Sequence, residues 1–224
     1  MKNNLLVFLI TIVVFFSCNS SNTDSHYVAN DSLTAKGEVQ DVNLYIKTHI
    51  LDYYMKELKT RNTETPAMKI LVDSNHIDKE FSFLNGIELR EINSEDSSSG
   101  GTYVVPFEKN YIKGDLNGDS QDDYVIPVYA TGGGSSEWRE IFVFISKNKR
   151  LEYFKMYSSF DLAHCDSKGS NGGQFYPNKI SNSILTGESY CYLESDPHCC
   201  PSIKMQAQYK FDNGLIFSNQ TPIK

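Results

Sequence analysis

Residues 203–211, IKMQAQYKF, alternate strictly between apolar and polar side chains. Because successive side chains of a β-strand point to opposite faces, this pattern predicts a strand with one face on a core and one in water. Asp212-Asn213-Gly214 follows and predicts a turn into a further short strand at 215–217. The C-terminal end of the chain therefore indicates an antiparallel sheet.

Strand signals extend upstream from this segment as far as residue 68. The candidates are residues 68–72, 81–84, 87–92, 103–107, 123–130, 139–146, 151–157 and 183–193. Asn85-Gly86 predicts a type I′ hairpin turn between two of them, and residues 147–150 close another hairpin. The glycine runs at 132–136 and 169–173 lack the Lys-Ser/Thr and the helix of a phosphate loop, so we expect exposed hairpin connections there.

Residues 38–60 carry a helical pattern ahead of the strands. One face consists of Val42, Ile46, Ile50 and Tyr53, and a neighbouring stripe consists of Leu44, Leu51, Met55 and Leu58. Two adjacent stripes predict a wide buried face. The fold class that we expect is therefore α+β, with an N-terminal amphipathic helix packed on a mostly antiparallel β-sheet. Residues 38–219 form a single domain in this interpretation.

The first eighteen residues, MKNNLLVFLITIVVFFSC, predict export and lipid attachment. The apolar run at 5–16 is shorter than the about 20 residues of a membrane-spanning helix and fits a secretory signal, which we place at 1–17. Ser17-Cys18 resembles the lipobox of bacterial lipoproteins, in which the cysteine is acylated, although Phe15 stands where that pattern prefers Leu. The alternative is an ordinary signal peptide, with Cys18 as a free thiol or a bridge member.

Residues 18–37 are polar and without periodicity, which is typical of a flexible tether between a membrane surface and a folded domain. Asn19 replaces the Asp that often retains such lipoproteins in an inner membrane, which favours the outer membrane or the cell surface. The formal charge of −7 argues against nucleic acid as a partner. The expected partners are the membrane, through the lipid anchor, and an unknown envelope protein or ligand.

Residues 115–123, DLNGDSQDD, form the strongest local motif for metal binding. The candidate ligands are the side chains of Asp115, Asn117, Asp119 and Asp123 and the backbone carbonyl of Gln121. Ca²⁺ prefers such hard oxygen ligands, and the loop resembles the calcium loops of FG-GAP-type repeats. Ser120 stands where that pattern has a glycine at positive φ, which costs about 1 kcal/mol. We predict a structural Ca²⁺ here; the alternative is an acidic turn capped by its own side chains.

Four cysteines follow the tether, at Cys165, Cys191, Cys199 and Cys200. An even set in an exported protein predicts disulfides. A vicinal bridge strains its ring, so we expect Cys165 and Cys191 each to pair with one of the two adjacent cysteines. His164-Cys165 and His198-Cys199-Cys200 leave open a Zn²⁺ or Cu⁺ site, although neighbouring strand residues point to opposite faces.

Three segments together resemble a known group of proteins: GDLNGDSQDDYVIPVY from Gly114, the glycine-rich turn, and DPHCCPS followed by a strand and Asn-Gly-Leu. They are similar to bacterial envelope lipoproteins of the LppP/LprE type, which carry a GDLNGDGxxDA-like segment and a DPxCCPS motif. The resemblance covers about half of the chain, from Gly114 to Leu215, and Cys199-Cys200-Pro201-Ser202 is its most specific part. It implies an envelope lipoprotein and adds no catalytic residue.

No GxSxG, HExxH or Cys-His-Asn pattern indicates an enzyme. The function that we expect is a non-enzymatic binding or structural domain, lipid-anchored in the cell envelope and containing a structural calcium loop. A hydrolase or other enzyme with a loop-built site is one alternative. A metal-handling lipoprotein that uses the His-Cys pairs is another. Trp138, the single tryptophan, lies either at a binding rim or packed at a strand start.

Overall fold

The computed structural model describes residues 40–62, 68–77, 85–93, 99–132, 137–165, 170–197 and 200–223. The chain divides into residues 1–35 and a compact unit at 36–224, to which all the described residues belong. The predicted signal, Cys18 and the whole of the predicted tether lie outside the described residues, as do the strand candidate at 81–84, His198 and Cys199. No helix among the described residues is long and apolar enough to span a membrane.

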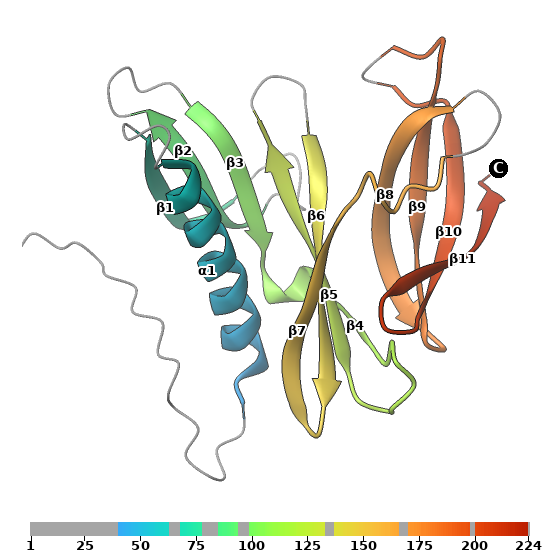
Figure 1. Ribbon diagram of the computed structural model, residues 1–224, viewed down its shortest axis with the longest axis horizontal. Coiled ribbons are helices and arrows are strands. Elements are labelled where there is room, and N and C mark those ends of the chain that lie inside the picture. The colour runs from blue at the N-terminus through green and yellow to red at the C-terminus, as the bar shows by residue number, and fades with distance from the viewer. Residues whose placement is uncertain are drawn as a thin grey trace, which may run out of the picture. The chain divides into compact units, whose positions relative to one another are not determined.

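One α-helix and eleven strands make up the described fold (Figure 1). They are α1 (Val42–Asn62), β1 (Met68–His76), β2 (Gly86–Asn93), β3 (Ser99–Pro106), β4 (Ile112–Gly114), β5 (Asp123–Thr131), β6 (Glu137–Lys147), β7 (Arg150–Ser158), β8 (Ser170–Ser181), β9 (Ile184–Leu193), β10 (Ile203–Phe211) and β11 (Leu215–Pro222), with a 3₁₀ turn at Glu108–Asn110. A helix packed on a mostly antiparallel sheet is confirmed.

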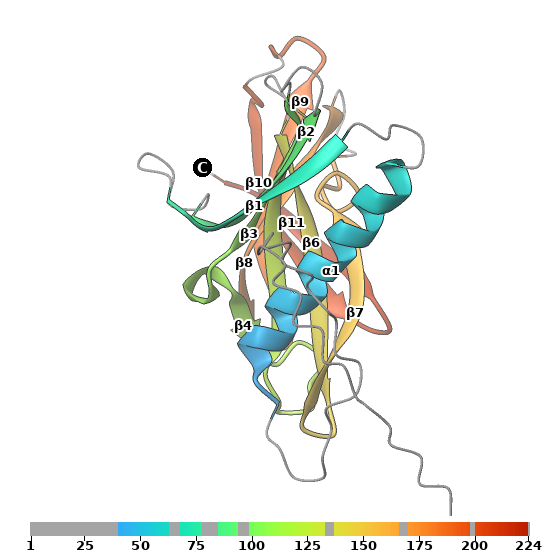
Figure 2. The same cartoon turned by 90° about the vertical axis from the view of Figure 1, so that its left-hand side faces the viewer.

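The strands form two antiparallel sheets. The larger sheet has the order β1-β2-β3-β5-β6-β7. The short strand β4 also pairs with β5, at residues 123–125, whereas β3 pairs with residues 129–131. The smaller sheet has the order β11-β10-β9-β8. The helix lies on one face of the larger sheet, and the smaller sheet packs on the opposite face (Figures 1 and 2). The larger sheet is therefore the middle of three layers.

Helix α1 buries one face against the larger sheet. Ile46, Ile50 and Tyr54 are at most 2% exposed and pack with Phe142 and Phe144 of β6. The helix starts four residues later than predicted, where the Asp41 carboxylate accepts the Leu44 N–H at 3.0 Å. The second predicted stripe is not buried throughout, because Leu44 is 56% exposed.

A second core lies between the two sheets. Its buried members are Leu116, Val125, Ile141, Val143, Leu162, Phe175, Ile180, Leu185, Ala207 and Tyr209. Ser159, fully buried after β7, joins the sheets directly: its N–H donates to the Arg139 carbonyl, and its carbonyl accepts the Phe175 N–H, both at 2.9 Å. The alternating strand at 203–211 is confirmed as β10, which turns its buried residues Ala207 and Tyr209 into this core.

Two predictions about turns and strands were wrong. Gly86 is not in a hairpin turn, because it lies within β2 and pairs with His76 on one side and Pro106 on the other. A Cβ at Gly86 would lie 2.0 Å from the Val105 carbonyl oxygen, so close strand approach requires this glycine. The run at 169–173 is not a simple connection either, because β8 begins at Ser170.

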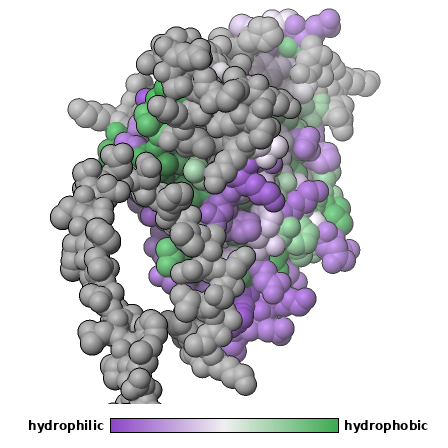
Figure 3. Space-filling view, turned by 60° about the vertical axis from the view of Figure 1, so that its left-hand side comes forward, coloured by the Kyte–Doolittle hydropathy of each residue, from purple (hydrophilic) through white to green (hydrophobic). Residues whose placement is uncertain are grey.

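The hairpin between β6 and β7 is confirmed, with Asn148 and Lys149 both at positive φ. Asn182 and Ser183 make the same kind of turn between β8 and β9, which the sequence patterns did not reveal. Large exposed apolar residues are Leu44, Leu71, Val72, Ile77, Phe154, Phe160, Ile216 and Ile223. Figure 3 shows hydrophilic and hydrophobic residues interspersed over the described part of one face.

Candidate functional site

A groove of about 1260 Å³ lies between the start of β6 and the outer face of β8 and β9. It arises from strand alternation in β9, where Leu185, Ser189 and Cys191 are buried. The intervening residues, Glu188 and Tyr190 among them, point to the opposite face. The groove therefore occupies the face of the smaller sheet that turns away from the core.

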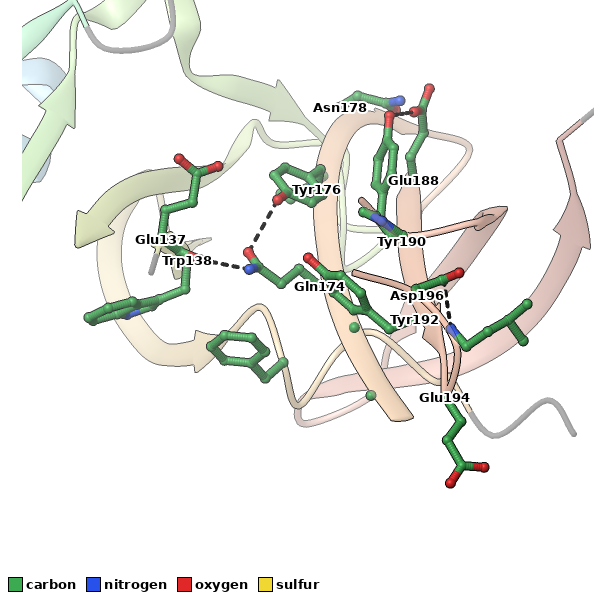
Figure 4. A pocket seen from close by; sticks show the side chains of 16 residues that line it. Glu137, Trp138, Gln174, Tyr176, Asn178, Glu188, Tyr190, Tyr192, Glu194 and Asp196 are labelled. Carbon is green, nitrogen blue, oxygen red and sulfur yellow. Dashed lines mark hydrogen bonds between the residues drawn. The ribbon is translucent and has the colours of Figure 1, made fainter. Parts of the chain in front are cut away.

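The described lining of the groove is aromatic and acidic (Figure 4). Its aromatic residues are Trp138, Phe160, Tyr176, Tyr190 and Tyr192, and its carboxylates are Glu137, Glu188, Glu194 and Asp196. Gly172, Gly173, Gln174, Pro177, Asn178, Leu193 and Pro201 complete it. No lysine, arginine or histidine is among these described lining residues, so the groove concentrates negative charge beside ring faces.

Cross-strand pairs order the side chains on the β8–β9 wall. Tyr176 pairs with Glu188, and Gln174 pairs with Tyr190. The Tyr190 hydroxyl donates to the Glu188 carboxylate at 2.6 Å, and this bond, with burial, raises the pKa of Tyr190 to about 12. Gln174 donates from Nε2 to the Glu137 carbonyl at 2.7 Å and accepts the Tyr176 hydroxyl at 3.2 Å, which ties β8 to β6.

Cationic side chains already lie over two tyrosines of the groove. The Arg139 guanidinium is 5.4 Å from the ring centre of Tyr176, and the Lys204 ammonium is 5.2 Å from that of Tyr190. Ring faces attract cations within about 6 Å. Tyr176 and Tyr190 therefore each have a cation of the chain itself near one ring, and the other aromatic residues of the lining have no such contact among the described residues.

Asp196 holds the loop that follows β9. Its carboxylate accepts the N–H groups of Leu193 and Ser202, both at 2.8 Å, and the Ser202 hydroxyl. The bond from the Ser202 hydroxyl and the two backbone bonds lower the pKa of Asp196. This part of the DPHCCPS segment therefore shapes the rim of the groove.

The candidate calcium loop is held together by its own side chains. The Asp115 carboxylate accepts the N–H groups of Gly118, Asp119 and Ser120 at 2.7, 3.1 and 2.9 Å. Asn117 Oδ1 accepts the Asp119 N–H at 3.0 Å. Ser120 has φ of 66°, the strained conformation expected where the pattern has glycine. Such hydrogen bonds occur in an acidic turn without an ion, and carboxylates that bind a cation accept them as well. They therefore fit both interpretations of the loop.

Asp123 differs from the other candidate ligands because it is fully buried. It accepts the N–H groups of Leu116, Asn117 and Ser146 at 2.7, 3.1 and 2.7 Å. Burial raises the pKa of Asp123, and the three backbone bonds oppose that rise. Gln121 lies at the edge of the loop, where its Oε1 accepts an N–H from the β6–β7 turn at 2.8 Å. Among the described residues, no three His, Cys, Asp or Glu side chains are gathered as a metal site.

The cysteines form disulfides, but the predicted pairing was wrong. Cys165 is bonded to Cys191, with Cα atoms 5.5 Å apart. Cys200 is also disulfide-bonded. Neither Cys18 nor Cys199 lies among the described residues, and these two complete the five cysteines of the chain. The pairing follows from β8 and β9 being neighbours, which no local pattern indicates.

The bond also removes Cys165 from any metal site, since a disulfide sulfur is not a thiolate ligand. His164 packs as an aromatic residue, with its ring stacked on Phe217 at 4.0 Å. Trp138 combines both of its predicted roles: it packs against the helix-side core and borders the groove.

Comparisons with protein-family models, with curated proteins and with solved structures found no match. The groove is therefore described from its own residues. Sequence reasoning missed it, although one signal was present: Glu188, Tyr190 and Tyr192 occupy alternate positions of a predicted strand.

Proposed function

We propose that this chain is a lipid-anchored protein of the bacterial cell envelope whose domain binds a cationic ligand in the aromatic–acidic groove and catalyses no reaction. The observation that carries the proposal is the described lining, with four carboxylates, five aromatic rings and no basic side chain. Ring faces and carboxylates both attract ammonium and guanidinium groups. A basic peptide segment or a polyamine has the matching chemistry.

The state of the carboxylates favours binding over acid–base catalysis. Glu137 and Glu194 are exposed to water, and Asp196 is occupied by hydrogen bonds of the rim loop. Paired catalytic carboxylates work where different surroundings separate their pKa values, commonly through burial of one of them. This supports a binding groove over the alternative of a hydrolase.

The ligand class is tested by titrating the full chain, purified in detergent, with an oligolysine peptide. Trp138 is the only tryptophan and borders the groove, so its fluorescence reports binding. Changing Glu137, Glu188 and Glu194 together to Gln keeps side-chain size and removes three charges. We expect binding to weaken about tenfold, since each partly exposed ion pair contributes on the order of 0.2–1 kcal/mol.

The matched control changes Glu57, Glu108 and Glu152 to Gln, three exposed carboxylates outside the described lining of the groove. It removes the same charge and is expected to bind like wild type. Equal weakening in both variants would mean general attraction to an acidic protein. No binding by wild type would refute the cationic ligand class.

The location is proposed from the N-terminal signal and from the likeness to LppP/LprE-type envelope lipoproteins. Acylation of Cys18 would hold the domain at the outer membrane or the cell surface. Cys18→Ala is expected to release the mature protein from membranes or to leave an uncleaved precursor, seen by cell fractionation and mass. A variant that matures and fractionates like wild type would end the lipid-anchor proposal.

A structural Ca²⁺ is proposed for the loop at 115–123, with Asp115, Asn117, Asp119, the Gln121 carbonyl and Asp123 as its ligands. The strained Ser120 makes modest affinity the expectation, on the order of 10⁻⁴–10⁻³ M. Ca²⁺ at ten times its dissociation constant then raises stability by about 1.4 kcal/mol. Melting in EDTA and in millimolar Ca²⁺ tests this, with Asp119→Ala as control. If Ca²⁺ does not raise the melting temperature of wild type, or raises that of the variant equally, the loop is an acidic turn without a calcium site.

A further inference from the structure

A second, smaller pocket has the opposite charge to the groove. It has a volume of about 580 Å³ and shares only Pro177 and Asn178 with the groove. Its described lining is Pro106, Lys109, Asn110, Tyr111, Ile112, Lys113, Pro127, Arg139, Pro177, Asn178, Lys179 and Ile180. Four of these residues are basic and none is acidic, although the whole chain carries a formal charge of −7.

The basic residues come from separate elements that the fold brings together. Lys109 lies in the 3₁₀ turn, Lys113 in β4, Arg139 in β6 and Lys179 in β8. Lys113 is paired with Asp122 at 2.9 Å. Lys109 and Lys179 are exposed and form no ion pair within the described residues. Four basic side chains therefore line this pocket, and one of them, Lys113, is paired with an acidic residue outside the described lining.

Arg139 is the buried charge of this pocket, with only 7% of its surface exposed. Its guanidinium lies 4.6 Å from the Tyr129 ring centre and 5.4 Å from that of Tyr176, and Nη1 donates to the Trp138 carbonyl at 3.3 Å. Desolvation lowers the pKa of Arg139 more than Tyr176, Glu137 and Tyr129 raise it. A guanidinium in this position is a side chain with which an oxyanion in the pocket could form charge-assisted hydrogen bonds.

Asn110 supplies a second, independent indication. Its side-chain Nδ2 is buried and has no hydrogen-bond acceptor. An unsatisfied buried donor costs about 1–3 kcal/mol and is uncommon in native proteins. Rotation of the Asn110 side chain, which lines the pocket, would offer this N–H to an oxygen atom held there.

We propose that this pocket binds a phosphate-type oxyanion, contacted by Asn110, Arg139, Lys109 and Lys179. Guanidinium and ammonium groups are the side chains that recognise such oxygens, and the pocket volume admits a phosphate monoester as well as the free ion. Pro127 and Pro177 have no backbone N–H group and therefore offer no backbone donor to a bound oxyanion.

The test is calorimetric titration of the detergent-purified full chain with inorganic phosphate, at an ionic strength held constant with NaCl. Lys179→Glu reverses one exposed charge of the pocket. Asn110→Asp replaces the amide donor by a carboxylate of nearly the same size. Each variant is expected to bind phosphate at least tenfold more weakly, about 1.4 kcal/mol. Melting temperatures confirm that both variants fold.

Lys147→Glu is the matched control, because Lys147 is exposed at the end of β6 and is not part of the described lining. Titration with glycerol 3-phosphate distinguishes the source of the oxyanion: tighter binding than phosphate indicates a lipid headgroup, and weaker binding indicates free phosphate. The proposal is overturned if phosphate binds no better than chloride, if Lys179→Glu and Asn110→Asp bind like wild type, or if Lys147→Glu loses as much affinity.

Discussion

Small residues decide how closely the strands of this protein approach one another. A Cβ at Gly173 would lie 2.4 Å from the Cys165 sulfur, and one at Gly187 would lie 2.6 Å from the Phe175 ring. Phe175 is fully buried in the core between the sheets, so its ring cannot move away freely. The absence of a side chain at Gly187 thus makes room for an aromatic ring of the core.

Gly187→Ala is expected to lower the free energy of unfolding by about 1–3 kcal/mol, because the added methyl group overpacks this core. The new Cβ would also lie 2.3 Å from the Tyr176 carbonyl oxygen. Gly132→Ala is the control, since its Cβ meets only the Trp138 ring at 3.9 Å. Urea unfolding of both variants gives the comparison, and equal stabilities would contradict the packing argument.

At the scale of elements, helix α1 is joined to the larger sheet by polar as well as apolar contacts. The Tyr54 hydroxyl donates to Glu140 of β6 at 2.6 Å, and burial raises the pKa of Tyr54 well above its usual range. His49, on the same helix, packs 4.3 Å from the Tyr153 ring of β7 and edge-on to Phe144. His49 is therefore packed among aromatic rings at the boundary of the core.

The His49 contact predicts a pH dependence of stability. Burial lowers the pKa of His49 below 6.5, and the nearby Asp52 only partly opposes this. The unfolded chain therefore takes up the proton first as pH falls. Stability contributed by neutral His49 is present above pH 6.5, falls as pH drops below that value, and stops falling below the folded-state pKa.

The slope for one proton is at most about 1.4 kcal/mol per pH unit. Tyr45 and Tyr153 both contact the His49 ring. His49→Gln removes the titrating group. Urea unfolding between pH 5 and 8 is expected to show a shallower pH dependence in the variant than in wild type. If the free energy of unfolding changes with pH equally in both proteins, groups other than His49 cause the pH dependence.

At the scale of the whole molecule, the larger sheet contributes side chains to two hydrophobic cores, one on each of its faces. Its helix side packs around Phe142 and Phe144, and its other side meets Phe175 and Tyr209 of the smaller sheet. The groove and the smaller, basic pocket both lie where the smaller sheet meets β6. The Cys165–Cys191 bond ties the segment before β8 to β9 in this region.

Replacing Cys165 and Cys191 together by Ala is expected to lower the free energy of unfolding by about 3–4 kcal/mol. The estimate follows from the loop entropy of a bond between residues 26 apart in the chain. Denaturant unfolding of the two proteins under oxidising conditions measures the difference. A double variant as stable as wild type would show that the bond does not stabilise the fold.

Local patterns predicted many of the individual strands. The alternation at 203–211 and the turn residues at 147–150 both led to the observed elements β10 and the β6–β7 hairpin. The local patterns failed where a residue is required by contact with a segment that is distant in the sequence. Asn85-Gly86 has the composition of a turn, but Gly86 is needed because β3 passes close to it. The sequence patterns did not predict the start of β8, because its glycines indicate a loop when the partner strand is unknown.

The sequence by itself determined the helix-and-strand content, the acidic loop and the presence of disulfides. Each depends on residues close together in the chain, or on simple counts of them. Only the tertiary structure decided which cysteines pair, which strand faces meet, and that Glu137 joins Glu188 and Tyr190 in one groove. Such juxtapositions depend on how sheets pack over long chain separations, and the free energy that selects one packing is spread over many contacts.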